Sequence, residues 1–185
     1  SHDFLKKAIL TEIPTVLRLG STTEVKDVKQ EINTIESIKN SSNKLEMKRI
    51  FKENNIHSPE FYTVEEANKI NKFPIVAKKI YRSRGQGMTL LKTKEELNEF
   101  LSNESLVGMY FEKYFSGNKE YRIHFVGNNY FAYRKLIKED TEKTLRYFKN
   151  SINCNFILET NELFKKPICW NDIINECLKT KEIIG

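Results

Sequence analysis

The chain has 185 residues and a mass of 21.8 kDa, enough for one ordinary domain or two small lobes without disulfide support. An apolar fraction of 39%, with 7 glycines and 4 prolines, excludes collagen-like, low-complexity and wholly disordered chains. The net charge of +6 keeps nucleic acid among the candidate partners. However, the basic residues alternate with acids and form no block, which argues against specific nucleic-acid binding.

Cysteine usage and hydropathy indicate the compartment. Cys154, Cys169 and Cys177 are odd in number and lack C-x-x-C spacing, so they predict neither a disulfide framework nor a zinc site. Such cysteines are typical of a reducing environment, and we predict a cytoplasmic location. No stretch approaches the run of about 18 apolar residues that a spanning helix needs, so no membrane partner is expected.

The N-terminal part predicts a short strand and two helices. Residues 14–19 (PTVLRL) alternate as a strand that ends at Gly20. Asn43 and Glu46 have the spacing of a capping box and predict a helix that begins at this asparagine. The apolar residues that recur at roughly helical intervals before this cap are Val28, Ile32, Ile35 and Ile38.

Two further capping boxes flank a predicted hairpin. Thr63 and Glu66 open one predicted helix. Thr93 and Glu96 open another. Between them, residues 73–92 contain two apolar strands around a glycine-containing turn, which is typical of a hairpin.

A second hairpin and a helix follow. Residues 120–126 alternate as a strand, residues 127–129 (GNN) supply a turn, and residues 130–137 form the partner strand. Apolar residues at helical spacing in 170–178 predict an amphipathic helix. Helices that alternate with hairpins predict an α+β fold.

The first hairpin is a candidate anion site. Lys78 and Lys79 point to opposite faces of a strand that is otherwise apolar, and a buried ammonium needs an anion. Residues 85–87 (GQG) form a turn whose backbone N–H groups can wrap a phosphate, with charge and a hydroxyl from residues 82–84. The alternative is an ordinary solvated hairpin turn.

The strand at 120–126 carries a second candidate. Period two places Glu120, Arg122 and His124 on one face, either as a ligand site or as the solvent-facing side of an antiparallel sheet. Arg134 and Lys135 on the partner strand add positive charge nearby. The two arginines can each hold a phosphate or carboxylate bidentately. We interpret His124 as a polar surface residue and not as a general base.

Four segments in this order resemble the ATP-grasp family, in particular its carboxylate–amine ligase branch. They are similar to segments of ribosomal-protein glutamate ligases and of viral ATP-grasp proteins of unassigned substrate. The segments are Asn43-Lys44-Leu45, IHSPEFY, FPIVAKKIYRSRGQGM and MYFEKYFSGNKEYRIHFVGNNYFAYRK. The resemblance implies an α+β ATP-grasp fold in which antiparallel sheets of two lobes grip a nucleotide. The implied division is a preceding segment at 1–42, a small lobe at 43–110 and an incomplete second lobe at 111–185.

The resemblance also implies roles for individual residues. Lys44 and Lys78 match the lysines that touch ATP phosphates, and Glu120 matches the acid that holds the ribose hydroxyls. Arg122 matches an arginine that faces the reacting centre, and Arg134 or Lys135 matches a basic pair on the next strand. The implied phosphate-covering loop contains Ser83, Gly85, Gln86 and Gly87. The implied adenine hinge comprises Glu112, Lys113, Tyr114 and Phe115.

Two departures from the family pattern concern the lysine strand and the metal. Lys79 stands where the family usually has proline, and one extra residue separates Glu112 from Glu120. The family's Mg²⁺ ligands include a Glu-x-Asn motif, and 159–161 (ETN) has that form but comes too early, so we interpret it as a coincidence. Residues 164–185 resemble the helix that precedes the metal strands. We therefore expect this chain to end before its metal site and to be inactive alone.

The first functional hypothesis is an ATP-dependent, Mg²⁺-requiring ligase that joins a carboxylate to an amine through an acylphosphate. Its substrates are unassigned, and peptides and proteins are among the candidates. The alternatives are a non-catalytic nucleotide-binding or protein-interaction module and, with less support, a nucleic-acid binder.

Overall fold

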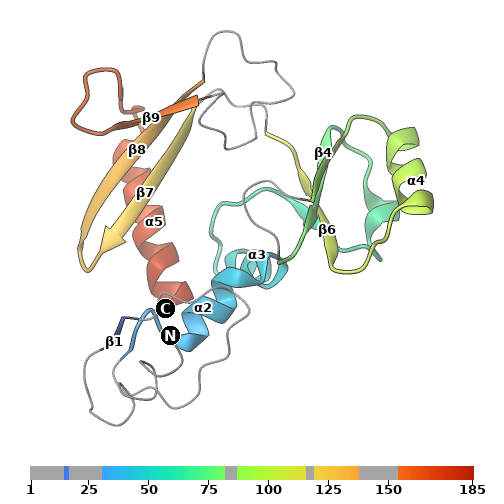
Figure 1. Cartoon of the computed structure of the whole chain (residues 1–185), viewed down its shortest axis with the longest axis horizontal. Helices are drawn as coiled ribbons and strands as arrows, with labels where there is room; N and C mark the ends of the chain where they lie inside the picture. The colour runs from blue at the N-terminus through green and yellow to red at the C-terminus, as the bar shows by residue number, and fades with distance from the viewer. Residues whose placement is uncertain (1–14, 17–30, 82–86, 116–118, 138–153) are drawn as a thin grey trace. The chain divides into compact units, whose positions relative to one another are not determined.

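The computed structural model describes residues 15–16, 31–81, 87–115, 119–137 and 154–185 (Figure 1). Contacts divide the chain into two compact units. Residues 1–58 and 179–185 belong to one unit, and residues 59–178 belong to the other. The lobe boundaries predicted after residues 42 and 110 stay predictions. Among the described helices, none is both long enough and apolar enough to cross a membrane.

The first unit begins with a pair of short parallel strands, β1 (Thr15–Val16) and β2 (Glu31–Ile32). Helix α2 (Ile35–Ser42) starts after Thr34, whose hydroxyl oxygen accepts a hydrogen bond from the Ser37 N–H at 3.0 Å. The helical pattern predicted to include Ile32 is therefore too long at its start. The reason is local: Asn33 has a φ of 63°, which ends the strand and precludes a continuous helix there.

Helix α3 (Lys44–Glu53) follows with the predicted cap. The Asn43 side-chain oxygen accepts from the Glu46 N–H at 3.1 Å, so one of the unpaired N–H groups of the first turn is satisfied. Within the same unit, Lys179 Nζ donates to the Asn54 carbonyl at 2.8 Å. This bond ties the end of the last helix to the end of α3.

The second unit contains a four-stranded antiparallel sheet in the order β3-β6-β4-β5. Its strands are β3 (Phe61–Tyr62), β4 (Ile75–Lys79), β5 (Met88–Leu91) and β6 (Met109–Lys113). The predicted hairpin is formed by β4 and β5. The predicted lobe boundary after residue 110 falls inside β6, which pairs with both β3 and β4.

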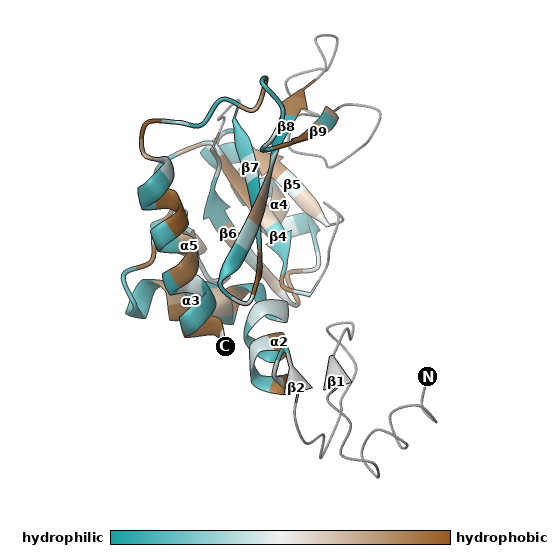
Figure 2. Cartoon of the chain, turned by 90° about the vertical axis from the view of Figure 1, so that its left-hand side faces the viewer, coloured by the Kyte–Doolittle hydropathy of each residue, from teal (hydrophilic) through white to brown (hydrophobic). Residues whose placement is uncertain are grey.

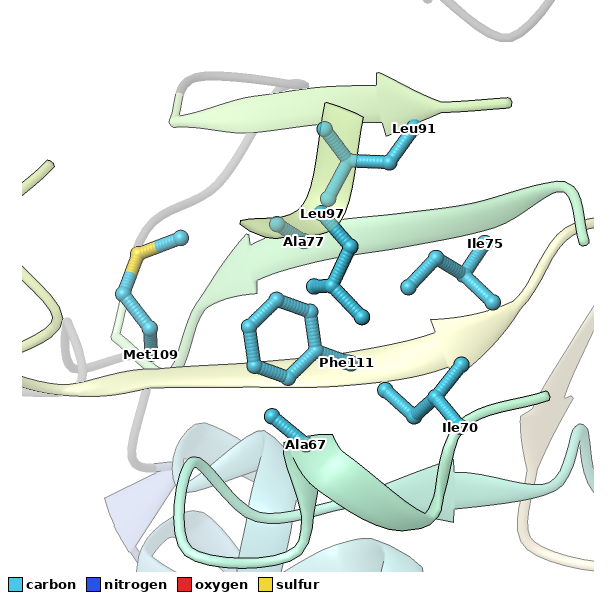
Figure 3. Packing of buried hydrophobic residues seen from close by; sticks show 8 residues of the cluster. All are labelled: Ala67, Ile70, Ile75, Ala77, Leu91, Leu97, Met109 and Phe111. Atoms are coloured by element: carbon cyan, nitrogen blue, oxygen red, sulfur yellow. The ribbon is translucent and has the colours of Figure 1, made fainter. Parts of the chain in front are cut away.

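One face of this sheet carries the hydrophobic core of the region (Figure 3). Helix α4 (Lys94–Asn103) covers it with Leu97, and its cap is the predicted one, since the Thr93 hydroxyl accepts from the Glu96 N–H at 3.2 Å. Phe111 is fully buried at the centre of the cluster. The buried members are Ala67, Ile70, Ile75, Ala77, Leu91, Leu97, Met109 and Phe111.

The helix predicted after Thr63 is only the 3-10 turn η1 (Ala67–Lys69). Glu66 does accept from the Thr63 N–H at 3.2 Å, as a capping box requires. The helix stops because Ile70 takes an extended conformation, with ψ of 116°, and inserts into the core. Tertiary packing therefore overrides the local helix signal.

The second sheet of this unit has the order β7-β8-β9 and is also antiparallel. It comprises β7 (Glu120–Val126), β8 (Asn129–Ile137) and β9 (Cys154–Leu158). Gly127 takes a φ of 60° in the predicted β7–β8 turn, a conformation that favours glycine.

Helix α5 (Trp170–Ile184) has one hydrophobic and one hydrophilic side (Figure 2). Its residues Trp170 and Ile174 join Ala132 of β8 and the buried Phe164 in a second core cluster. Tyr121 and Ile123 pack against this cluster, so one face of the sheet is buried. The other face is available to carry polar groups.

Candidate functional site

Lys78 of β4 lies in a mostly buried, charged cluster with Glu112 of β6. Because Ile75 and Ala77 belong to the core, the alternation of β4 places Lys78 on the opposite face of the sheet. Glu112 shares that face, and its Oε1 accepts a hydrogen bond from the Lys78 ammonium. The side chains are 21% and 9% exposed, so this ion pair is largely removed from water.

Tyr110 extends the same cluster. Its hydroxyl donates to Glu112 Oε2 at 3.3 Å, so both carboxylate oxygens are engaged. Burial, reinforced by the neighbouring carboxylate, raises the pKa of Tyr110. Tyr110 therefore stays a neutral donor. The sequence analysis did not single out this tyrosine, although its spacing of two residues from Glu112 on a strand is the signal for a shared face.

The neighbouring lysine has a different role. Lys79 Nζ donates to the carbonyls of Ser105 at 3.3 Å and Val107 at 3.2 Å. It therefore ties β4 to the loop that precedes β6. The two adjacent lysines of β4 lie on opposite faces, as the sequence predicted.

A second charged cluster lies on the sheet β7-β8-β9, on the face opposite α5. Glu120 Oε2 accepts from Lys135 Nζ at 3.1 Å, and its Oε1 accepts from Arg122 Nε at 3.3 Å. Lys135 is only 3% exposed. The strand register explains this grouping, because Glu120 is directly opposite Lys135.

Arg122 also contacts an aromatic ring. Its guanidinium carbon lies 3.9 Å from the centroid of the Phe156 ring, which is a cation–π contact. Arg122 Nη2 is buried and has no hydrogen-bond partner within the described part of the chain. Phe156 was missed by the sequence analysis, since only the pairing of β8 with β9 brings it beside Arg122.

Arg134 does not join this cluster. It is directly opposite Tyr121, which faces the core, so its side chain lies on the other face of the sheet from Arg122. Arg134 Nη1 donates to the carbonyls of Leu163 at 2.7 Å and Phe164 at 3.1 Å. Of the basic pair on β8, Lys135 is therefore the member that the structure brings to Glu120.

The predicted adenine hinge continues from the end of β6. The Lys113 N–H donates to the Glu60 carbonyl at 2.9 Å, and the Tyr114 N–H donates to the Pro74 carbonyl at 3.2 Å. Phe115 is 64% exposed, with the Lys113 ammonium 5.5 Å from its ring centroid. An adenine recognised through this backbone would have to use groups other than those two N–H groups.

The structure describes only some of the other residues that are predicted to contact the nucleotide. Lys44 is the first residue of α3 and belongs to the first compact unit. Gly87 has a φ of 66°, and its carbonyl accepts from the Lys79 N–H at 3.1 Å. Ser83, Gly85 and Gln86 lie outside the described residues. The nucleotide contacts of all these residues stay predictions.

No carboxylate cluster of the described residues fits Mg²⁺: they contain no group of three or more His, Cys, Asp or Glu side chains arranged to hold a metal ion. Glu159 pairs with Lys166, and its N–H donates to the Ala132 carbonyl at 3.0 Å. The Asn161 side-chain oxygen accepts from the Leu163 N–H at 2.9 Å. Magnesium thus stays a prediction without assigned ligands.

Comparison with known proteins identifies the fold. Neither a family model nor a curated protein sequence matches the chain. Among solved structures, carboxyaminoimidazole ribonucleotide synthase from Aspergillus clavatus, complexed with ATP, is similar with a TM-score of 0.62 and 12% identity. An ATP-grasp ligase complexed with a minimal precursor gives 0.57 and 12%. L-amino acid ligase from Bacillus licheniformis gives 0.54 and 16%.

These matches cover 85%, 84% and 81% of this chain, respectively. The chain spans only 41%, 48% and 35% of the matched chains. The chain therefore has the ATP-grasp fold, and the family resemblance and the α+β class predicted from the sequence are confirmed at the level of fold.

Proposed function

We propose that this chain binds ATP and is part of an ATP-dependent carboxylate–amine ligase. The observation that carries the proposal is a matched pair of charged clusters within an ATP-grasp fold. One is Lys78 with Glu112 on β4 and β6, and the other is Glu120 with Arg122 and Lys135 on β7 and β8. Each cluster sets a lysine and a glutamate on the sheet face that does not carry the hydrophobic core.

Each group has a chemical task in this proposal. Lys78 provides a cation for the phosphates of ATP, because charge-assisted hydrogen bonds to phosphate are stronger than neutral ones. Glu120 accepts hydrogen bonds from the ribose hydroxyls. Arg122 stabilises the negative charge on the transferred phosphoryl group, since phosphoryl transfer is catalysed mainly by positioning and electrostatics.

The reaction has two steps. A substrate carboxylate oxygen attacks the γ-phosphorus of ATP, the bond from that phosphorus to the bridging oxygen breaks, and ADP leaves. An amine then attacks the carbonyl carbon of the acylphosphate, the carbon–oxygen bond to phosphate breaks, and the amide forms with loss of one proton from nitrogen. Because no described carboxylate cluster fits Mg²⁺, neither step is assigned to a metal ligand of this chain.

Calorimetric titration of the 185-residue chain with MgATP tests the proposal. We expect measurable binding that Lys78→Met weakens at least about tenfold, which corresponds to the loss of one charge-assisted contact. The matched control is Lys79→Met, which removes the same charge from the other face of the same strand and should change the dissociation constant less than about twofold.

Folding of each variant is checked by circular dichroism. A folded wild-type chain that gives no binding heat with millimolar MgATP would overturn the proposal, as would equal affinities for Lys78→Met and wild type. Because the 185-residue chain is expected to be inactive alone, amide formation is assayed with a chain extended past Gly185. Nucleotide binding without amide formation by that longer chain would favour the non-catalytic nucleotide-binding module.

A further inference from the structure

The face of β7-β8-β9 that carries Glu120 changes character along the strands. Glu120 and Lys135 are paired across β7 and β8, and Phe156 continues their row on β9. Arg122 is followed across the sheet by Tyr133 and Leu158, and His124 pairs with Phe131 in the next row. We call the aromatic and apolar part of this face the aromatic surface. Its members are His124, Phe131, Tyr133, Phe156 and Leu158.

The register places these side chains on one face. His124 is directly opposite Phe131. Tyr133 is opposite both Arg122 and Leu158. Directly paired residues of antiparallel strands share a face, so the surface is continuous from Arg122 across β8 to β9.

The rings of the aromatic surface are already packed against each other. His124 stacks on Phe131, with centroids 5.0 Å apart and planes 7° from parallel. Tyr133 meets both rings edge-on at 5.8 and 5.9 Å. Such aromatic contacts fix side-chain positions, so the surface is preformed.

Several members of this surface are also exposed to solvent. Phe131 is 41%, Phe156 37% and Leu158 41% exposed. Single exposed apolar residues are normal on proteins, but adjoining ones mark ligand or partner sites. The position of the aromatic surface next to Arg122 indicates what kind of ligand it would bind.

Arg122 borders the aromatic surface and supplies its charge. The guanidinium lies over Phe156, and its buried Nη2 has no hydrogen-bond partner in the part of the chain that the structure describes. A carboxylate can accept from this N–H group. The strand rise of about 3.4 Å per residue puts His124 roughly 7 Å from Arg122. A ligand that holds its carboxylate at Arg122 can therefore place a neighbouring ring on the aromatic surface.

We propose that the aromatic surface binds the side chain of the carboxylate substrate, and that this side chain is apolar, preferably aromatic. The inference rests on the proposed function, in which Arg122 faces the reacting group. It deepens that function by naming a substrate class. An acidic side chain would be disfavoured here, because it would lose hydration against apolar rings.

The test is an NMR titration of the 185-residue chain with 3-phenylpropanoate. Two comparison probes separate the contributions of the ring and of the carboxylate to binding. Propanoate lacks the ring, and 3-phenylpropanamide lacks the charge. We expect 3-phenylpropanoate to shift the ring resonances of His124 and Phe131 and to bind at least about tenfold more tightly than either comparison probe.

Two leucine variants locate the site. Leu158→Ser should weaken 3-phenylpropanoate binding at least about fivefold by removing apolar contact. Leu163→Ser is the matched control, because Leu163 is 51% exposed but lies in the loop after β9, outside the aromatic surface. Its affinity should equal that of the wild type. Equal weakening by both variants, or by neither, would overturn the assignment.

Two further probes distinguish a free amino acid from a peptide end. Tighter binding of L-phenylalanine assigns the free amino acid, whereas tighter binding of N-acetyl-L-phenylalanine assigns a peptide carboxylate. Weaker binding of both than of propanoate would contradict the inference.

The inference and the proposed function fail in different ways. If MgATP binds but the three small probes bind alike, the aromatic surface is not a substrate site. If 3-phenylpropanoate binds as expected but MgATP does not, the ligase proposal is overturned while the surface remains a carboxylate site.

Discussion

Lys78 and Glu112 form an ion pair across two neighbouring strands, β4 and β6, with the Tyr110 hydroxyl on the second carboxylate oxygen. Three polar groups are thus satisfied by one another at a largely buried position. Such a cluster is tolerated in the fold only while each member keeps its partner.

The first prediction concerns the stability of this pair. Lys78→Met should lower the free energy of unfolding by about 2–4 kcal/mol, because it leaves the Glu112 carboxylate without its cation. The double variant Lys78→Met/Glu112→Leu should recover at least half of that loss. Urea denaturation of the three proteins measures both values. A single variant as stable as the wild type would show that the pair is not a buried interaction in solution.

Ribose recognition by Glu120 gives the second prediction. We expect the wild-type chain to bind ATP more tightly than 2′,3′-dideoxyATP by about 1.5–3 kcal/mol, the value of hydrogen bonds to a charged group. Glu120→Ala should abolish this preference. Glu159→Ala, which removes a carboxylate paired with Lys166, is the control and should retain it. Competition binding measures all three preferences, and a preference that survives in Glu120→Ala would assign the ribose elsewhere.

The third prediction separates the two arginines of the second hairpin. Arg134→Ala should destabilise the fold by about 1–3 kcal/mol, because it frees two carbonyls of the loop that contains the buried Phe164. Arg122 is 30% exposed, and Arg122→Ala should cost less stability than Arg134→Ala. Thermal unfolding followed by calorimetry decides the order. The reverse order would show that Arg122 is the main structural anchor.

The fourth prediction concerns alkaline pH. A hydrogen bond to the Glu60 carboxylate is the main cause that raises the pKa of Tyr62 to about 12, from 10.0. Because the folded chain holds this proton more tightly than the unfolded chain, the contribution to stability is complete below pH 10 and decreases as the pH rises toward 12. Tyr62→Phe should remove this part of the pH dependence. Tyrosinate absorbance should then show one fewer group that ionises near pH 12, and an unchanged titration would contradict the assignment.

The second hairpin shows how much of the site follows from sequence. Strand alternation and the turn residues at 127–129 predict the hairpin. The observed turn contains only residues 127 and 128, and this shorter turn places Glu120 opposite Lys135. Strand alternation also implies that Arg134 and Lys135 lie on opposite faces, which distinguishes two residues that the family resemblance leaves as alternatives.

Other features depend on long-range packing. Phe156 lies beside Arg122 because β9 pairs with β8, and no local pattern fixes that pairing across the intervening residues 138–153. The shortened helix after Thr63 has a similar origin, because insertion of Ile70 into the core competes with helix extension. Local signals therefore predicted the elements better than their lengths and partners.

The strand orders place Glu112 and Glu120 on strands that differ in how firmly they are held. β6 is hydrogen-bonded on both sides, by β3 and β4, so Glu112 cannot shift without breaking two ladders. Within the described sheet, β7 pairs only with β8, so Glu120 lies on an edge strand that can adjust at lower cost. A ligand that contacts both glutamates would bind one rigid strand and one more mobile strand. Its binding would therefore slow amide hydrogen exchange in β7 far more than in β6.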